Sequence, residues 1–238
     1  MLDRILRKIL SSKKWRSQPY SGSIYESVIE NFLRHGFHLI PFGQLANPLH
    51  RELHVRHDID TDDCLRNVGP LLELDVKLGV PSSWFFRLDD MVYSIDRAKD
   101  VLDLVARSGK VAGVHSTSYL RSRDSQTLKL VFQEELTRAS QFLDSSILPV
   151  TIHGEGLRNL TLRRELENTV RSGATGEISP FTIQHDIHDT PFGYQHVFDD
   201  SRLLRDGSRY LGLDFKVPHL AAPCGKTGFL SHPGYWQG

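Results

Sequence analysis

Cysteine is scarce in this chain of 238 residues, which contains only Cys64 and Cys224. Two thiols so far apart cannot form a disulfide framework, although one bridge remains open, and reduced thiols in a cytoplasm are the simpler interpretation. An excess of either charge is also missing, because Lys+Arg and Asp+Glu both number 29. Without a basic block after residue 15, we expect no nucleic-acid partner.

Long hydrophobic runs are absent as well, and no stretch reaches the roughly 18 apolar residues that a spanning helix needs. Residues 1–20 are predicted to form an amphipathic helix and a connector, with apolar residues at helical spacing between Leu2 and Leu10. We expect this helix to dock on its own domain. Contact of residues 1–15 with a membrane surface is the less favoured alternative, and it would place a cytoplasmic protein at the inner face of the membrane.

From residue 21 to 238, helix and strand patterns alternate, and no domain linker interrupts them. This alternation predicts one α/β domain, a mostly parallel sheet wrapped by helices and closed, or nearly closed, into a barrel. A kink or split is expected at Gly69-Pro70, and a long polar loop at 184–193. The expected helices span 24–36, 62–78, 96–108, 125–144 and 160–172, and the expected strands span 37–42, 53–60, 82–88, 110–115, 147–153, 174–178, 194–198, 210–217 and 228–232.

A pair of carboxylates ends the strand at 53–60. Asp58 and Asp60 should project to the same side because side chains alternate along a strand, and two like charges so close need a cation or a shared proton. A strand-end turn with Thr61, Asp62 or Asp63 as N-cap is the competing interpretation. The spacing alone favours neither interpretation.

Three histidines end other predicted strands: His115, His153 and His232. The carboxyl ends of strands converge in this architecture, so these side chains should face the paired carboxylates. Two imidazoles and one carboxylate form a catalytic site for a divalent metal, zinc first among them. The second carboxylate and the third histidine would then act as base and acid in hydrolysing an amide or ester. The sequence contains no Gly-x-Ser-x-Gly elbow, so it does not indicate a covalent intermediate.

The order of these motifs resembles the polysaccharide deacetylase family, in particular its divergent His-Asp-x-Asp branch, which includes deacetylases of O-antigen and other surface glycans. The resemblance covers residues from about 50 to the C-terminus. It implies a distorted (β/α) barrel of incomplete TIM-like form and metal-dependent N-deacetylation of amino sugars. The motifs that carry it are Arg56-His57-Asp58-Ile59-Asp60, residues 78–86, Gly113-Val114-His115, Ile152-His153-Gly154, residues 198–201 and Ser231-His232-Pro233-Gly234-Tyr235-Trp236.

The resemblance also implies roles for individual residues. Asp60 and His115 would bind the metal, and His153 would replace the family's further histidine, whose place four residues after His115 is taken by Tyr119. Asp58 would be the base. The presumed acid is His232, and the substrate contacts are Arg56, Tyr119, Asp200, Tyr235 and Trp236.

The sequence therefore predicts a divalent-metal-dependent deacetylase that removes an acetyl or formyl group from an amino sugar during surface-polysaccharide assembly. One alternative is a catalytically impaired barrel that binds glycan or acts as a scaffold, which the tyrosine at position 119 would favour. Hydrolysis of a phosphate or another ester in the same pocket is a weaker alternative, because no basic cluster lies near the expected ligands.

Overall fold

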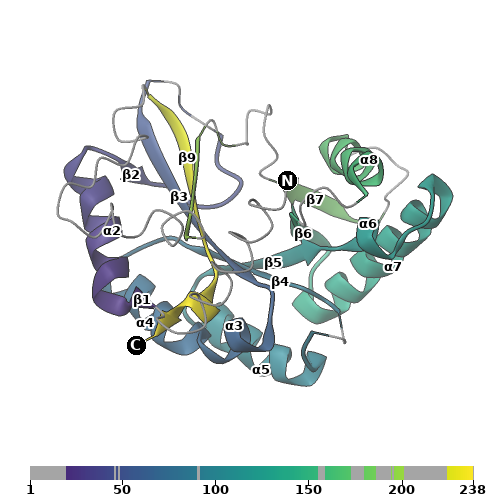
Figure 1. Cartoon of the computed structure of the whole chain (residues 1–238), viewed down its shortest axis with the longest axis horizontal. Coiled ribbons are helices and arrows are strands. Elements are labelled where there is room, and N and C mark those ends of the chain that lie inside the picture. The colour runs from purple at the N-terminus through teal and green to yellow at the C-terminus, as the bar shows by residue number, and fades with distance from the viewer. Residues whose placement is uncertain are drawn as a thin grey trace, which may run out of the picture.

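A parallel β-sheet with helices on its outer side forms the centre of the protein (Figure 1). The computed structural model describes residues 20–45, 47, 49–89, 92–154, 159–172, 180–185, 194, 196–200 and 224–237. The helices are α2 (Gly22–Arg34), α3 (Asp62–Arg66), α4 (Val68–Lys77), α5 (Ile95–Arg107), α6 (Ser118–Arg121), α7 (Ser125–Leu143), α8 (Leu160–Arg171) and the 3-10 turn η1 (Pro233–Tyr235). The strands are β1 (Tyr20–Ser21), β2 (His38–Leu39), β3 (Arg51–Ile59), β4 (Ser83–Phe86), β5 (Val111–Ser116), β6 (Ile147–Ile152), β7 (Thr182–His185), β8 (His196–Asp199), β9 (Gly225–Ser231) and β10 (Trp236–Gln237).

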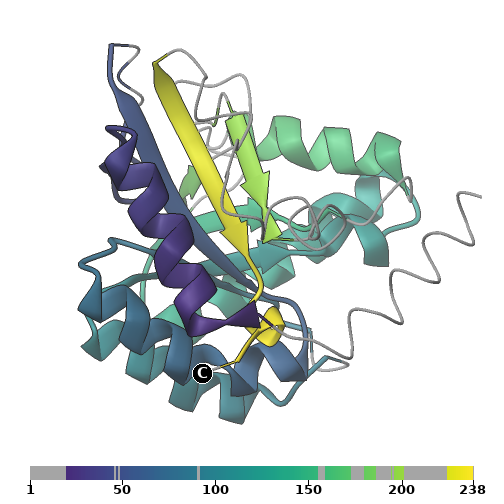
Figure 2. The same ribbon diagram turned by 60° about the vertical axis from the view of Figure 1, so that its left-hand side comes forward.

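The strand order confirms the predicted parallel barrel. The main sheet runs β7-β6-β5-β4-β3-β9-β8, with every described pairing parallel, and β2 lies beside the first half of β3. From β3 to β7 the strands are neighbours in chain order, while β9 pairs with the other side of β3 and β8 pairs with β9. A barrel with this strand order would close between β7 and β8. No pairing joins β7 to β8 among the described residues, so the barrel is incomplete there. Figure 2 shows β9 lying between β3 and β8 along its length.

The two faces of the sheet have different chemistry. Aromatic side chains on the outer face pack against helices, as Phe86 does against Phe142 of α7 and Phe229 against Tyr25 of α2. Alternation along each strand then turns the neighbouring residues toward the barrel interior. Buried polar side chains of β3, His54, Arg56 and Asp58, lie on this interior face together with the aromatic ring of Phe85.

The segment after β3 resolves the choice among the predicted caps. Thr61 is the N-cap of α3, and its side chain accepts a hydrogen bond from the backbone N–H of Cys64. The predicted helix at 62–78 is indeed split, but at Asn67, which ends α3 and precedes α4. Pro70 consequently lies in the first turn of α4, where its missing N–H has no helical partner to lose.

Two stretches differ from the predicted elements or lie outside the described residues. Thr182–His185 forms β7 beside β6, so the loop predicted from Gln184 begins too early. A strand of four residues is too short for its alternation of polar and apolar side chains to identify it in the sequence. The predicted strands at 174–178 and 210–217, and nearly all of the predicted N-terminal helix and connector at 1–20, lie outside the described residues. Within the described part of the chain, no helix combines the length and apolar character needed to span a bilayer.

Candidate active site

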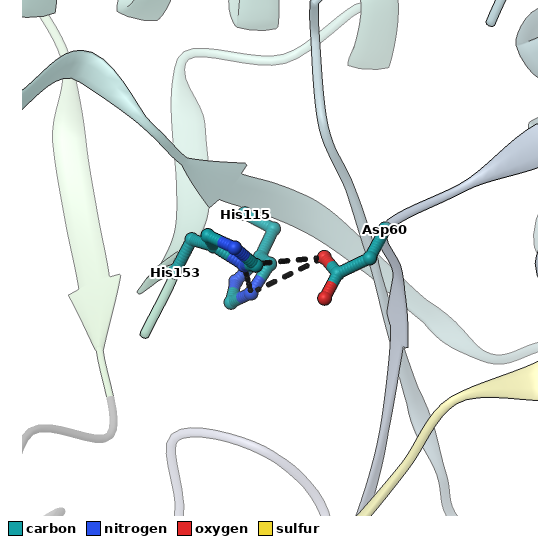
Figure 3. Close-up of side chains that lie close together, drawn as sticks. All are labelled: Asp60, His115 and His153. Carbon is teal, nitrogen blue, oxygen red and sulfur yellow. Dashed lines mark hydrogen bonds and ion pairs between the residues drawn. The ribbon is translucent and has the colours of Figure 1, made fainter. Parts of the chain in front are cut away.

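Asp60, His115 and His153 come together at the carboxyl ends of three strands, as Figure 3 shows. Asp60 directly follows β3, His115 lies near the end of β5, and His153 directly follows β6. The Asp60 Oδ1 atom lies 3.5 Å from His115 Nε2 and 3.4 Å from His153 Nδ1. A hydrogen bond of 3.0 Å joins the two imidazole nitrogens. One oxygen and two nitrogens therefore surround the same point.

The donor set fits a divalent metal. Asp60 Oδ1 is buried and has no hydrogen bond of good geometry from any residue that the structure describes, and a buried carboxylate oxygen in this state is typical of a cation site. Ligands at about 2.0 to 2.1 Å from a tetrahedral zinc ion lie about 3.3 Å apart, close to the three separations observed here. Burial acts to raise the pKa of Asp60, but the surrounding imidazoles outweigh it and hold the pKa well below its usual value. The carboxylate is therefore ionised, as a ligand must be.

Both imidazoles are held by groups behind them. Burial lowers the pKa of His115 to about 4, so its ring is neutral at neutral pH and able to ligate. His115 Nδ1 lies 2.7 Å from the Thr151 hydroxyl, an outer contact that orients the ring with Nε2 toward Asp60. The buried Tyr119 hydroxyl donates to the backbone carbonyl of His153 at 2.9 Å. The tyrosine that occupies the family's histidine position thus supports the histidine from the next strand.

Asp58 lies beside this triad and is clamped by an arginine. Arg56 Nε and Nη2 donate to its two carboxylate oxygens at 2.6 and 2.7 Å, and its Oδ2 atom lies 3.6 Å from His115 Nε2. Burial acts to raise the pKa of Asp58, but Arg56 and then His115 outweigh it, so the pKa is lowered. Asp58 is consequently an oriented anion on the same side of β3 as Asp60, as the alternation predicts.

His232 faces the triad from β9 and is paired with Asp200. Asp200 accepts hydrogen bonds from His232 Nδ1 (2.8 Å), from the His232 backbone N–H (2.6 Å) and from Trp236 Nε1 (3.1 Å). Burial and the neighbouring Asp199 carboxylate raise the pKa of Asp200, although His232 acts to lower it. Burial likewise acts to lower the pKa of His232, but Asp200 outweighs it and raises that pKa well above its usual value. His232 Nε2 lies 3.5 Å from Asp60 Oδ2, so a proton on this nitrogen faces the site.

The predicted substrate contacts divide into two groups. Tyr235 is partly exposed, and its ring centroid lies 5.1 Å from that of His232 at the edge of the site. The other four are buried and make hydrogen bonds within the protein, and their role as substrate contacts stays a prediction. They are Arg56, Tyr119, Asp200 and Trp236.

Sequence reasoning missed a buried network behind the site. His57 points away from Asp58, and its Nε2 lies 2.9 Å from Asp75 Oδ2 while its Nδ1 lies 2.5 Å from the Ser231 hydroxyl. The Tyr25 hydroxyl donates to the other oxygen of Asp75. Because Asp75 follows Val68, Leu71 and Leu72 on the buried face of α4, a charge on that apolar face was the signal available in the sequence.

A second missed residue, Glu135 of α7, holds the loop after β5. It is buried and accepts hydrogen bonds from the hydroxyls of Ser116 and Ser118 and from the backbone N–H of Thr117. Arg121 Nη2 lies 3.2 Å away and pairs with its charge. This anchor fixes the segment that directly follows His115.

Comparison with known proteins adds a structural neighbour. No model of a protein family matches the sequence, and no curated protein matches it. Among solved structures, the chain is similar to a family 4 carbohydrate esterase from Bacillus anthracis. The two are 13% identical over 87% of this chain and 77% of that one, with a TM-score of 0.44. A similarity this low indicates no function for this chain, so only the residues of the site bear on what it does.

Proposed function

We propose that the protein is a divalent-metal-dependent deacetylase that hydrolyses the N-acyl amide of an amino sugar. The observation that carries the proposal is the buried Asp60 Oδ1, which lies beside two imidazole nitrogens and has no hydrogen bond of good geometry within the described part of the chain. The order of motifs along the chain supports an amino sugar as substrate and a role in surface-polysaccharide or O-antigen assembly. Zinc is the metal that this ligand set favours.

Asp60, His115 and His153 would hold the metal. A divalent cation there supplies a water of lowered pKa and polarises the acyl oxygen. Asp58 is the base, because it lies next to His115 Nε2 and can accept the proton of a water at that position. Arg56 holds both oxygens of Asp58, which fixes the direction in which the base faces.

His232 is the acid. Its raised pKa keeps the imidazole protonated at neutral pH, and Asp200 directs the Nε2 proton toward the site. The leaving amine can take that proton as the C–N bond breaks. The environments of Asp58 and His232 thus separate an ionised base from a protonated acid, as hydrolysis through a tetrahedral intermediate requires.

The alternative of a barrel without catalysis is less well supported. It drew on Tyr119 standing where the family has a histidine, whereas the structure has His153 beside Asp60 and His115. Elemental analysis of protein purified without chelator separates the two functions, because a scaffold needs no stoichiometric metal.

Acetate release from N-acetylated amino-sugar oligosaccharides tests the proposal. Asp58→Asn should bind zinc with unchanged affinity and lose about 10²- to 10⁴-fold in kcat, the usual contribution of a general base. Asp103→Asn, the same change at an exposed site on α5, is the matched control and should retain full activity. Full turnover by Asp58→Asn would contradict the assignment of the base.

A further inference from the structure

Arg87 lies beside the candidate metal ligands. Phe86, the last residue of β4, is paired with the residues that directly precede Asp60 in β3 and His115 in β5. Arg87 follows Phe86, and β4 is the strand between those two. The three backbone positions therefore lie at the same level of the sheet, with that of Arg87 between those of Asp60 and His115.

The alternation of β4 turns Arg87 toward the barrel interior. Phe85 is on the interior face, because the Arg56 guanidinium lies 5.5 Å above its ring, whereas Phe86 packs outward against α7. Arg87, two residues after Phe85, shares the interior face. Tyr93 holds this end of the strand, since its hydroxyl donates to the Ile59 carbonyl at 3.0 Å.

The Arg87 guanidinium is poorly satisfied. Its Nε is buried and has no hydrogen-bond partner among the described residues. Nη2 contacts Asp89 Oδ2 at 3.4 Å, a long separation for a charge-assisted bond. Arg56, the other arginine on this face, instead makes two bonds of 2.6 and 2.7 Å to Asp58. A buried donor without an acceptor is destabilising, which indicates a ligand that supplies the acceptor.

The charges around the site favour an anion. Asp58 neutralises Arg56, and Asp89 pairs with Arg87 at 3.4 Å. A divalent cation on Asp60 would then leave a net positive charge at the site. The planar fork of an arginine matches the paired oxygens of a carboxylate or a phosphate.

We propose that Arg87 binds an oxyanion on the substrate, so that the substrate is an acidic amino sugar with a carboxylate or phosphate near its N-acyl group. The inference rests on the proposed deacetylase function and narrows its substrate class. It concerns ligand charge, which can be measured by binding as well as by turnover.

Calorimetric titration of the zinc-loaded protein tests this with three probes: N-acetylglucosamine, its 3-O-carboxymethyl derivative and its 3-phosphate, whose charged groups lie next to the N-acyl group. Wild type should bind at least one charged probe about 10- to 100-fold more tightly than the neutral one, the range expected for a hydrogen bond to a charged group. Arg87→Gln should lose that preference while still binding zinc. Arg87→Lys, which keeps the charge and loses the fork, should fall between them. The charged probe whose affinity falls more in Arg87→Gln identifies the oxyanion.

Arg107→Gln is the matched control, because Arg107 is exposed in the last turn of α5, and it should bind all probes like wild type. An anion preference that survives in Arg87→Gln would overturn the inference, as would equal binding of neutral and charged probes by wild type. Acetate release from the same probes keeps the two proposals apart. Arg87-dependent binding without any release would reject the hydrolase and leave the anion site standing.

Discussion

Replacing Asp75 with alanine should destabilise the protein severely, because this carboxylate joins three elements behind the site. Its oxygens accept hydrogen bonds from Tyr25 on α2 and His57 on β3, and His57 in turn contacts Ser231 on β9. His57 and Ser231 are strand partners that directly precede Asp58 and His232. The network therefore sets the spacing of the proposed base and acid as well as the stability of the barrel.

The magnitude follows from the two bonds lost. Each of the two buried partners left unsatisfied costs about 1 to 3 kcal/mol. We therefore expect Asp75→Ala to lower the free energy of unfolding by about 4 kcal/mol, out of a typical 5 to 15 kcal/mol. For a chain of this length, that corresponds to a decrease in Tm of about 8 to 16 °C.

Urea unfolding and thermal melts of three variants test the reasoning. Asp75→Asn keeps an acceptor for Tyr25 and offers an amide donor to His57, so it should lose about 1 to 2 kcal/mol, less than half the alanine loss. Asp103→Ala, an exposed aspartate on α5, should change stability by less than about 0.5 kcal/mol. A loss below about 1 kcal/mol in Asp75→Ala, or equal losses in the alanine and asparagine variants, would refute this account of the network.

Two further predictions concern the barrel interior. Gly113→Ala should lower the free energy of unfolding by about 1 to 3 kcal/mol in urea titrations, because its methyl group would lie 2.5 Å from both the Phe85 ring and the Pro149 carbonyl; unchanged stability would show that this packing is not tight. Burial, followed by nearby cations, holds the pKa of His54 well below its usual value, so its contribution to stability is present above the unfolded pKa of about 6.5 and decreases as the pH falls toward the folded pKa. Between pH 6 and 5 the free energy of unfolding of wild type should therefore fall more steeply than that of His54→Gln, by up to about 1.4 kcal/mol per pH unit, and parallel pH curves would contradict the assignment.

The arrangement of the candidate ligands could be predicted because each one ends a strand. Periodicity identified β3, β5 and β6, and parallel strands bring their carboxyl ends to one edge. Asp60, His115 and His153 therefore had to lie near one another, and the structure has them in contact.

Contacts between distant elements could not be predicted in this way. Asp75 reaches His57 only because of how α4 packs on the sheet, and no local pattern encodes that packing. Tryptophan is a residue type that stacks on sugar rings, but the sequence does not show that the ring of Trp236 is buried and that its Nε1 donates to Asp200, 36 residues away. The position of Arg87 depends on strand register, which a single sequence does not specify.

Calorimetric titration with zinc tests the central claim most directly, namely that Asp60, His115 and His153 bind one metal ion. Wild type should bind one equivalent. Asp60→Ala, His115→Ala and His153→Ala should each lose more than the 10- to 100-fold in affinity typical of outer-sphere changes, while Asp58→Asn keeps wild-type affinity. Full-affinity binding by the His115 and His153 variants would contradict the claim.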